Sequence, residues 1–106
     1  MEVDFVKSGL TITFKNKFND YGTFMEASRD PIYRTILSAF KELKEKEKVA
    51  VSITANVDST EFESEIEFTK LNLDILRDVV NPYFEEIEDY ETCNKVIQLL
   101  SDLQST

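Results

Sequence analysis

The chain has 106 residues, a formal net charge of −9 and no histidine. This length predicts one domain, residues 1–106, and a hydrophobic content of 42% predicts a packed core rather than disorder. The lack of histidine and the single cysteine, Cys93, exclude Ser-His-Asp triads, His- or Cys-rich metal sites and an internal disulfide. No apolar run approaches the roughly 18–20 residues of a membrane span. With no visible signal peptide, we expect a cytoplasmic protein without membrane contact.

Alternating apolar and polar residues predict two N-terminal strands, residues 2–7 and 10–15. Ser8-Gly9 between them suits a two-residue hairpin turn, because glycine accepts the backbone angles that such turns need. Residues 16–29 contain apolar side chains without a clean period, so we expect a loop there with at most one helical turn.

A helix is predicted to start at Asp30-Pro31. An acid can cap the first turn and proline suits the first helical position, which makes this pair typical of a helix start. The mixed-charge run of residues 41–48 is typical of a solvated helix end with ion pairs four residues apart. Between these points the apolar residues are spaced as on one helix face: Ile32, Ile36, Leu37, Phe40 and Leu43.

A second hairpin is predicted from two alternating segments, residues 49–57 and 61–69, around a turn at Asp58-Ser59-Thr60. Because successive side chains of a strand point to opposite faces, one face of this hairpin should pack on the core and the other should meet water. The alternation predicts four buried side chains in particular: Val51, Ile53, Ile66 and Phe68.

Two helices are predicted at the C-terminal end. The first covers residues 71–80 and should end at Asn81, because Pro82 disfavours helical geometry at the residue before it. The second covers about residues 89–103, and Cys93 on its apolar stripe is typical of a small core residue rather than a reactive thiol. The inward residues expected on the two helices are Leu71, Ile75, Leu76, Val79 and Val80, then Cys93, Val96, Ile97, Leu100 and Leu103.

The order of these elements is ββ-α-ββ-αα, which predicts an α+β fold. Alternating strands are typical of antiparallel sheets with one wet face, so we expect a four-stranded antiparallel sheet with the helices packed on one face. The wet face would carry Glu2, Asp4, Thr11, Thr13, Lys15, Ser52, Thr54 and the glutamates of residues 61–69.

The net acidity lies in the second half of the chain. Residues 1–48 carry a net charge of +1 and residues 49–106 a net charge of −10. Four glutamates alternate along the predicted strand at residues 61–69, and their carboxylates would lie about 6.7 Å apart on one face, where like charges repel. Charges on a strand often serve only to discourage edge pairing, but that purpose does not require all four charges to have the same sign. We therefore take these residues as candidate partner-binding residues: Glu61, Glu63, Glu65 and Glu67.

A second acidic group surrounds the predicted bend between the last two helices. Asp89 and Glu91 are explained by the positive N-terminus of the helix that follows them. Tyr83 and Tyr90 are candidate aromatic anchors, since tyrosine is enriched at binding hot spots. The remaining acids of the group have no such structural explanation and are candidate partner-binding residues: Glu85, Glu86 and Glu88.

The sequence does not favour an enzyme. A pair of catalytic carboxylates needs two different environments, whereas a row open to solvent lacks the burial that tunes an acid. Parallel carboxylates about 6.7 Å apart do not converge on one cation, and neither a glycine-rich phosphate loop nor an EF-hand loop occurs. We therefore expect no catalytic residues, no cofactor and no metal site.

These observations favour a small binding protein, and an inhibitor in particular. In composition, the second half resembles small acidic proteins of phages and mobile elements that inhibit host machinery by occupying nucleic-acid-binding surfaces. The resemblance implies that the acidic sheet face docks on a basic surface of a nucleic-acid-binding protein as a mimic, while the chain itself repels nucleic acid.

The alternative is a phage or cellular assembly factor, chaperone or structural subunit that works through an apolar surface. A homo-oligomer is compatible with either function. The apolar surface of this alternative would be formed by Phe18, Tyr21, Phe24 and Met25.

Overall fold

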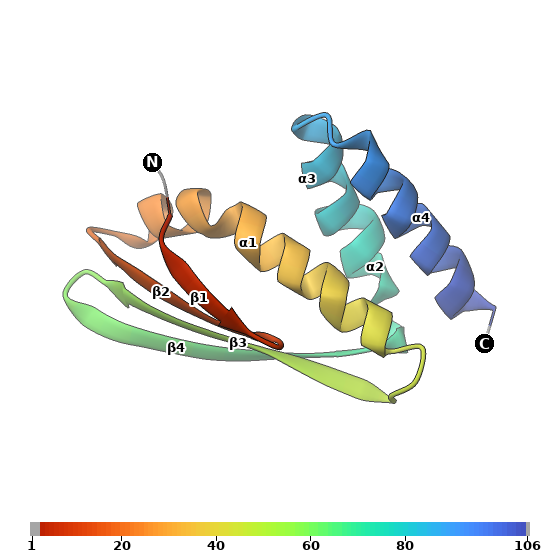
Figure 1. The fold of residues 1–106 in the computed structure, drawn as a ribbon, viewed down its shortest axis with the longest axis horizontal. Helices are drawn as coiled ribbons and strands as arrows, with labels where there is room; N and C mark the ends of the chain where they lie inside the picture. Colours follow the sequence, from red (N-terminus) through yellow and green to blue (C-terminus); the bar gives the residue numbers. More distant parts are fainter. Residues whose placement is uncertain (1–2, 106) are drawn as a thin grey trace. The chain divides into compact units, whose positions relative to one another are not determined.

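The computed structural model describes residues 3–105 and begins with a hairpin of β1 (Phe5–Ser8) and β2 (Thr11–Phe18) (Figure 1). Ser8 lies opposite Thr11, so the turn is Gly9-Leu10, one residue later than the predicted Ser8-Gly9. Gly9 has a φ of +60°, and glycine adopts this angle without steric cost, which explains why it occupies the first turn position. Met1 and Glu2, which the predicted strand pattern included, lie outside the described residues.

Helix α1 spans Tyr21–Glu42, so the predicted loop up to residue 29 and the predicted helix start at Asp30-Pro31 were wrong. The Asp20 carboxylate accepts a hydrogen bond of 2.8 Å from the backbone N–H of Thr23 and thereby caps the first turn. The buried stripe of the first turns consists of Phe24 and Ser28. Because Ser28 is polar, the helical period of this stripe cannot be recognised from the apolar residues alone.

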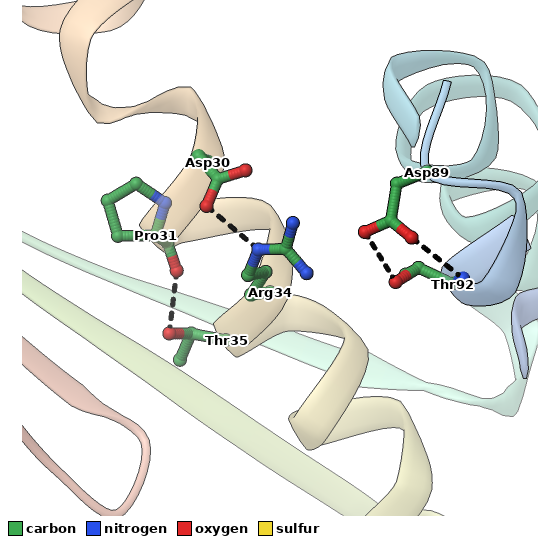
Figure 2. Close-up of polar contacts among 6 residues, drawn as sticks. All are labelled: Asp30, Pro31, Arg34, Thr35, Asp89 and Thr92. Atoms are coloured by element: carbon green, nitrogen blue, oxygen red, sulfur yellow. Dashed lines mark hydrogen bonds and ion pairs between the residues drawn. The ribbon is translucent and has the colours of Figure 1, made fainter. Parts of the chain in front are cut away.

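Pro31 lies inside α1, although proline removes a backbone donor from a helix interior. Figure 2 shows the Thr35 hydroxyl, which donates a 2.8 Å hydrogen bond to the Pro31 carbonyl oxygen, and Arg34 Nε, which donates to Asp30 Oδ2 at 2.8 Å. Beyond the proline the predicted stripe is buried, from Ile32 to Leu43. These local bonds and the packed stripe hold the helix on both sides of Pro31.

The strand that follows α1, β3 (Lys48–Val57), pairs with β2 in parallel, with Thr11 opposite Ser52 and Thr13 opposite Thr54. The prediction of an all-antiparallel sheet was therefore wrong. Helix α1 carries the chain back to the end at which β2 began, and two neighbouring strands joined in this way must run in the same direction. The sheet is mixed, with the strand order β1-β2-β3-β4.

The second hairpin joins β3 to β4 (Thr60–Thr69) through Asp58-Ser59, with Thr60 already in the strand. Both turn residues have positive φ, 52° and 60°, as a two-residue turn that matches the strand twist requires. Because β4 is an edge strand, its side chains have a strand neighbour on one side only. Accordingly Ile66 is 37% exposed and the prediction of its burial was wrong, whereas the burial predicted for the others is confirmed: Val51, Ile53 and Phe68.

The described residues form two compact units. The sheet unit contains β1, β2, α1 up to Thr35, and the segment Ala50–Ile66. In it Phe24 of α1 packs edge-on against Phe14 and Phe18 of β2, at ring-centroid distances of 5.5 and 5.2 Å. The first turns of α1 thus cover one face of the sheet (Figure 1).

The helical unit contains Ile36–Val49 and the chain from Glu67 onward. The prediction of one domain, residues 1–106, stays a prediction. In this unit Phe40 packs on Phe68 with a ring-centroid distance of 5.0 Å. Its C-terminal part consists of η1 (Lys70–Asn72), α2 (Leu73–Ile75), the π-helical η2 (Leu76–Val80), α3 (Asn81–Glu86) and α4 (Tyr90–Gln104).

The predicted helix end at Asn81 was wrong, because Pro82 lies in the first turn of α3, where no backbone donor is needed. The π-helical segment before it shifts the hydrogen bonding by one residue, so that the Asn81 N–H donates to the Leu76 carbonyl. This shift changes which residues face inward. Val79 is 41% exposed, contrary to prediction. Leu71, which lies in η1 before this segment, is 91% exposed, also contrary to prediction.

Helix α4 follows the predicted range to within one residue at each end. Cys93 is buried as predicted, and its burial, with Glu85 and Asp89 nearby, raises the pKa of its thiol. Ile97 was predicted to face inward but is 56% exposed, and Leu99 is buried instead. The core of the C-terminal helices includes the buried side chains of Phe84, Cys93, Leu99 and Leu103.

Candidate binding face

The glutamate row, Glu61, Glu63, Glu65 and Glu67, lies on β4, and all four side chains are exposed. The side chains between them lie on the sheet face that α1 covers, where the Phe62 ring contacts that of Phe24 at a centroid distance of 5.8 Å. The strand alternation therefore turns the four carboxylates away from the helix, as the sequence predicts.

The centre of the same sheet face carries neutral polar side chains. Thr11 and Thr13 of β2 lie beside Ser52 and Thr54 of β3, and all four point away from the helix. A shallow hollow of about 410 Å³ between β3 and β4 is lined by Ser52, Ile53, Thr54, Glu63, Ser64 and Glu65. Negative charge is thus concentrated along β4, and hydroxyl groups lie beside it.

The glutamate row lacks an internal counter-charge among the residues that the structure describes. Within residues 3–105, no ion pair and no side-chain hydrogen bond involves any of its four carboxylates. Lys48 of the neighbouring strand β3, and Lys15 and Lys17 of β2, are also exposed and are not paired with the row. Repulsion between neighbouring carboxylates is therefore relieved only by solvent ions or by a bound cationic partner.

The second acidic group belongs to the helical unit, and Glu85, Glu86 and Glu88 are exposed there. Glu85 Oε1 accepts a hydrogen bond of 3.0 Å from Asn81 Nδ2. Asp89 caps α4, because its carboxylate accepts from the backbone N–H of Thr92 at 3.2 Å and from the Thr92 hydroxyl at 2.7 Å (Figure 2). The structural explanation expected for Asp89 is thereby confirmed.

The two candidate aromatic anchors differ in accessibility. Tyr83 is only 8% exposed and packs on Phe84 at a ring-centroid distance of 5.1 Å, so it is a core residue of the helical unit. Tyr90 is 61% exposed at the start of α4. Of the two, only Tyr90 presents a surface to a partner.

The apolar residues of the alternative function separate into two pairs. Phe18 and Phe24 are 2% and 1% exposed, so they belong to the core rather than to a surface. Tyr21 and Met25 are 53% and 54% exposed, one turn apart on α1, and the Tyr21 ring lies 5.7 Å from that of Phe62. Both residues were named from the sequence, but their helical spacing of four residues was not recognised because the start of α1 was predicted as a loop.

Within residues 3–105, no group of three or more His, Cys, Asp or Glu side chains is arranged to hold a metal ion. None of the helices in this range combines the length and the apolar character needed to cross a membrane.

Comparison with protein-family models, curated proteins and solved structures finds no match to this chain.

Proposed function

We propose that this protein is a small binding protein that docks the glutamate row on a basic surface of a nucleic-acid-binding protein and thereby inhibits it. One observation carries the proposal: four exposed carboxylates of one strand face lack any cation among the described residues. A partner that supplies lysine or arginine side chains relieves their mutual repulsion and gains charge pairing at the same time.

The spacing of the row suits a surface that binds a phosphate backbone. One DNA strand presents a charge every 3.4 Å or so of its axis, and the row presents one about every 6.7 Å. The row therefore occupies alternate phosphate positions of a basic groove. Exposed Glu85, Glu86 and Glu88 form a second acidic group on the helical unit, and Tyr90 supplies an accessible aromatic side chain there.

The same features argue against other ligands of an acidic face. A chain with a net charge of −9 repels nucleic acid itself. Side-by-side carboxylates about 6.7 Å apart cannot share one cation, which needs oxygen ligands within about 2.6 Å of its centre. A protein surface with several separated cations is the ligand class that remains.

The test changes the row without changing its shape. In the variant E61Q/E63Q/E65Q/E67Q the fold should persist, because exposed strand substitutions seldom cost more than about 0.5 kcal/mol. Affinity for a basic partner captured from lysate should fall by about 2–5 kcal/mol, mainly through slower association and lost charge pairs. Binding of the unmodified protein should weaken steeply with NaCl, and DNA or RNA should compete for the partner.

A matched control keeps the change in net charge and moves it elsewhere. The variant E26Q/E45Q/E47Q/E91Q removes four other exposed glutamates and should bind the partner nearly as the unmodified protein does. If both variants lose affinity equally, net charge acts and the row does not. If the row variant folds and binds normally, this face has no part in the function.

The alternative function, assembly through an apolar surface, keeps one supporting observation. Tyr21 and Met25 are half-exposed one turn apart on α1, and the Tyr21 ring lies near that of Phe62 of β4. A partner held by this patch would bind independently of salt, whereas a partner of the glutamate row is released by salt. The same capture experiment at low and high salt therefore separates the two functions.

A further inference from the structure

Strand β4 forms an open edge of the sheet. It is ten residues long, Thr60–Thr69, contains neither proline nor glycine, and has β3 as its only neighbour among the described strands. Natural edge strands of this length are usually shortened, bulged or covered, because their unpaired backbone groups template the addition of another strand. Such an edge is a docking surface for an extended peptide segment.

The turn geometry determines which backbone groups face this edge. In a hairpin closed by a two-residue turn, the residues that flank the turn exchange both backbone hydrogen bonds, and bonded residues then alternate along each strand. Asp58-Ser59 is such a turn, so Thr60 and every second residue after it bond to β3. The backbone N–H and C=O groups of Glu61, Glu63 and Glu65 therefore point to the open edge.

A hydrogen bond further along β4 agrees with this alternation. Thr69 is in the same alternate set as the glutamates, and its backbone N–H donates to the Asn72 side-chain oxygen at 2.8 Å rather than to β3. The outward N–H at the end of the strand is thus satisfied within the chain. Among residues 3–105, β3 is the only strand paired with β4, and no backbone bond from a turn, loop or cap reaches Glu61, Glu63 or Glu65.

We propose that the partner contributes an extended segment with alternating basic residues, which adds to the sheet as a fifth strand along β4. This inference rests on the proposed function, because both use the glutamate row. It adds the mode of recognition: main-chain hydrogen bonds to Glu61, Glu63 and Glu65 supply the docking, and the charge pattern selects the segment.

The side chains of β4 select the occupant of the edge. In antiparallel addition, residues opposite the glutamates point to the same sheet face, where lysine or arginine would pair with each carboxylate. On the other face, Ile66 is 37% exposed and would pack against an apolar or β-branched residue of the added strand. A second copy of β4 would instead place glutamate beside glutamate, so the row disfavours self-pairing and favours a basic strand.

The test uses a capped heptapeptide, Lys-Val-Lys-Thr-Lys-Val-Lys, labelled for fluorescence anisotropy. Two derivatives carry methyl groups on backbone nitrogens, one at the last three lysines and the other at the three intervening residues. In antiparallel addition the lysine N–H groups bond to the glutamate residues, so methylation there should weaken binding at least about tenfold. Methylation of the intervening residues should change affinity by less than about twofold. The reverse order would support addition of a parallel strand, and equal affinities of the two derivatives, strong or weak, would overturn the proposal.

Amide hydrogen exchange gives an independent readout on the protein. The amides of Glu61, Glu63 and Glu65 should exchange rapidly in the free protein and become protected by the unmethylated peptide, whereas those of Phe62 and Ser64 should be protected throughout. Absence of new protection at saturating peptide would overturn strand addition.

The quadruple glutamine variant separates the two proposals. If it loses the peptide while the two methylated peptides bind the unmodified protein equally, charge docking stands and strand addition fails. If the variant binds the unmethylated peptide as tightly as the unmodified protein, the proposed function fails as well.

Discussion

The carboxylates of the C-terminal helices and those of β4 carry the same charge but lie in different surroundings. In the helices, Asp78 forms two 2.9 Å bonds with Arg77, and Asp102 lies 3.0 Å from Lys44 Nζ and accepts from Gln98. Asp89 caps α4. On β4, none of the four glutamates has an internal partner among the described residues.

This difference shows which acids stabilise the fold and which are available to a partner. At a helix end or within a helix, backbone donors and cationic side chains lie close to a short acidic side chain. An aspartate there therefore finds a hydrogen-bond donor or a cation nearby. The sheet unit has one such acid as well, because backbone and side-chain hydrogen bonds from Thr23 lower the pKa of Asp20. On the outer face of the edge strand, by contrast, four successive outward carboxylates have no partner among residues 3–105.

The largest expected effect compares one apolar change in the two regions. Phe84 of α3 is completely buried, so Phe84→Ala should lower the free energy of unfolding by about 3–5 kcal/mol. Phe62 of β4 is only partly buried, so Phe62→Ala should cost about 1–2 kcal/mol. Urea unfolding of both variants measures the two values. Equal costs would show that the edge strand is packed as tightly as the helices.

A smaller effect compares one acid from each region. Asp89→Ala removes the cap of α4 and should lower the free energy of unfolding by about 0.5–2 kcal/mol. Glu63→Ala removes an exposed carboxylate without a partner and should change it by less than about 0.5 kcal/mol. Thermal unfolding of the two variants under the same conditions gives the comparison. A clear loss of stability in Glu63→Ala would mean that the row is structural after all.

The strands and the glutamate row were predictable from sequence because a period of two is a strong local signal. The alternation in residues 49–57 and 61–69 correctly predicts strands, and it places the four glutamates on the outward face. The direction of pairing was not predictable from the same signal. The parallel pairing of β2 and β3 depends on α1, whose first turns are buried through Ser28 as well as Phe24.

Proline misled the prediction twice, for a common physical reason. Asp30-Pro31 and Asn81-Pro82 both look like helix boundaries, because proline lacks a backbone donor and restricts the residue before it. In α1 the Thr35 hydroxyl bonds to the Pro31 carbonyl, and before Pro82 a π-helical segment shifts the hydrogen-bond register. Tertiary packing on both sides of each proline, which no local rule contains, makes these solutions favourable.

The exposure of the candidate site residues was predictable except at Tyr83. All four residues of the glutamate row are exposed as expected, and so are Glu85, Glu86, Glu88 and Tyr90, whereas Tyr83 is buried and packs on Phe84. The open backbone edge of β4 could not be read from the sequence. It depends on strand order, which is a property of the whole sheet.

The smallest expected effect tests the helical carboxylates through pH. The Arg77 side chain holds the pKa of Asp78 below the ordinary value of 3.8, and Lys44 and then Gln98 do the same for Asp102. A lowered pKa means that the unfolded chain binds protons more readily than the folded one. These two groups therefore add stability above about pH 4, and that contribution is lost as the pH falls through their folded values.

Comparison of the unmodified protein with the variant D78N/D102N measures this contribution. The variant should unfold at a lower temperature at pH 7, and the difference in Tm should shrink as the pH falls below about 4, where the unmodified carboxylates become protonated. Removal of the cations in K44A/R77A should abolish the same part of the pH dependence, because the cations cause the lowered pKa values. Both ion pairs are exposed, so the effect should be small and should decrease further in salt. A difference in Tm that is the same at pH 7 and pH 3 would show that the charge of these two aspartates does not stabilise the helices, and the contrast with the glutamate row would then rest on geometry alone.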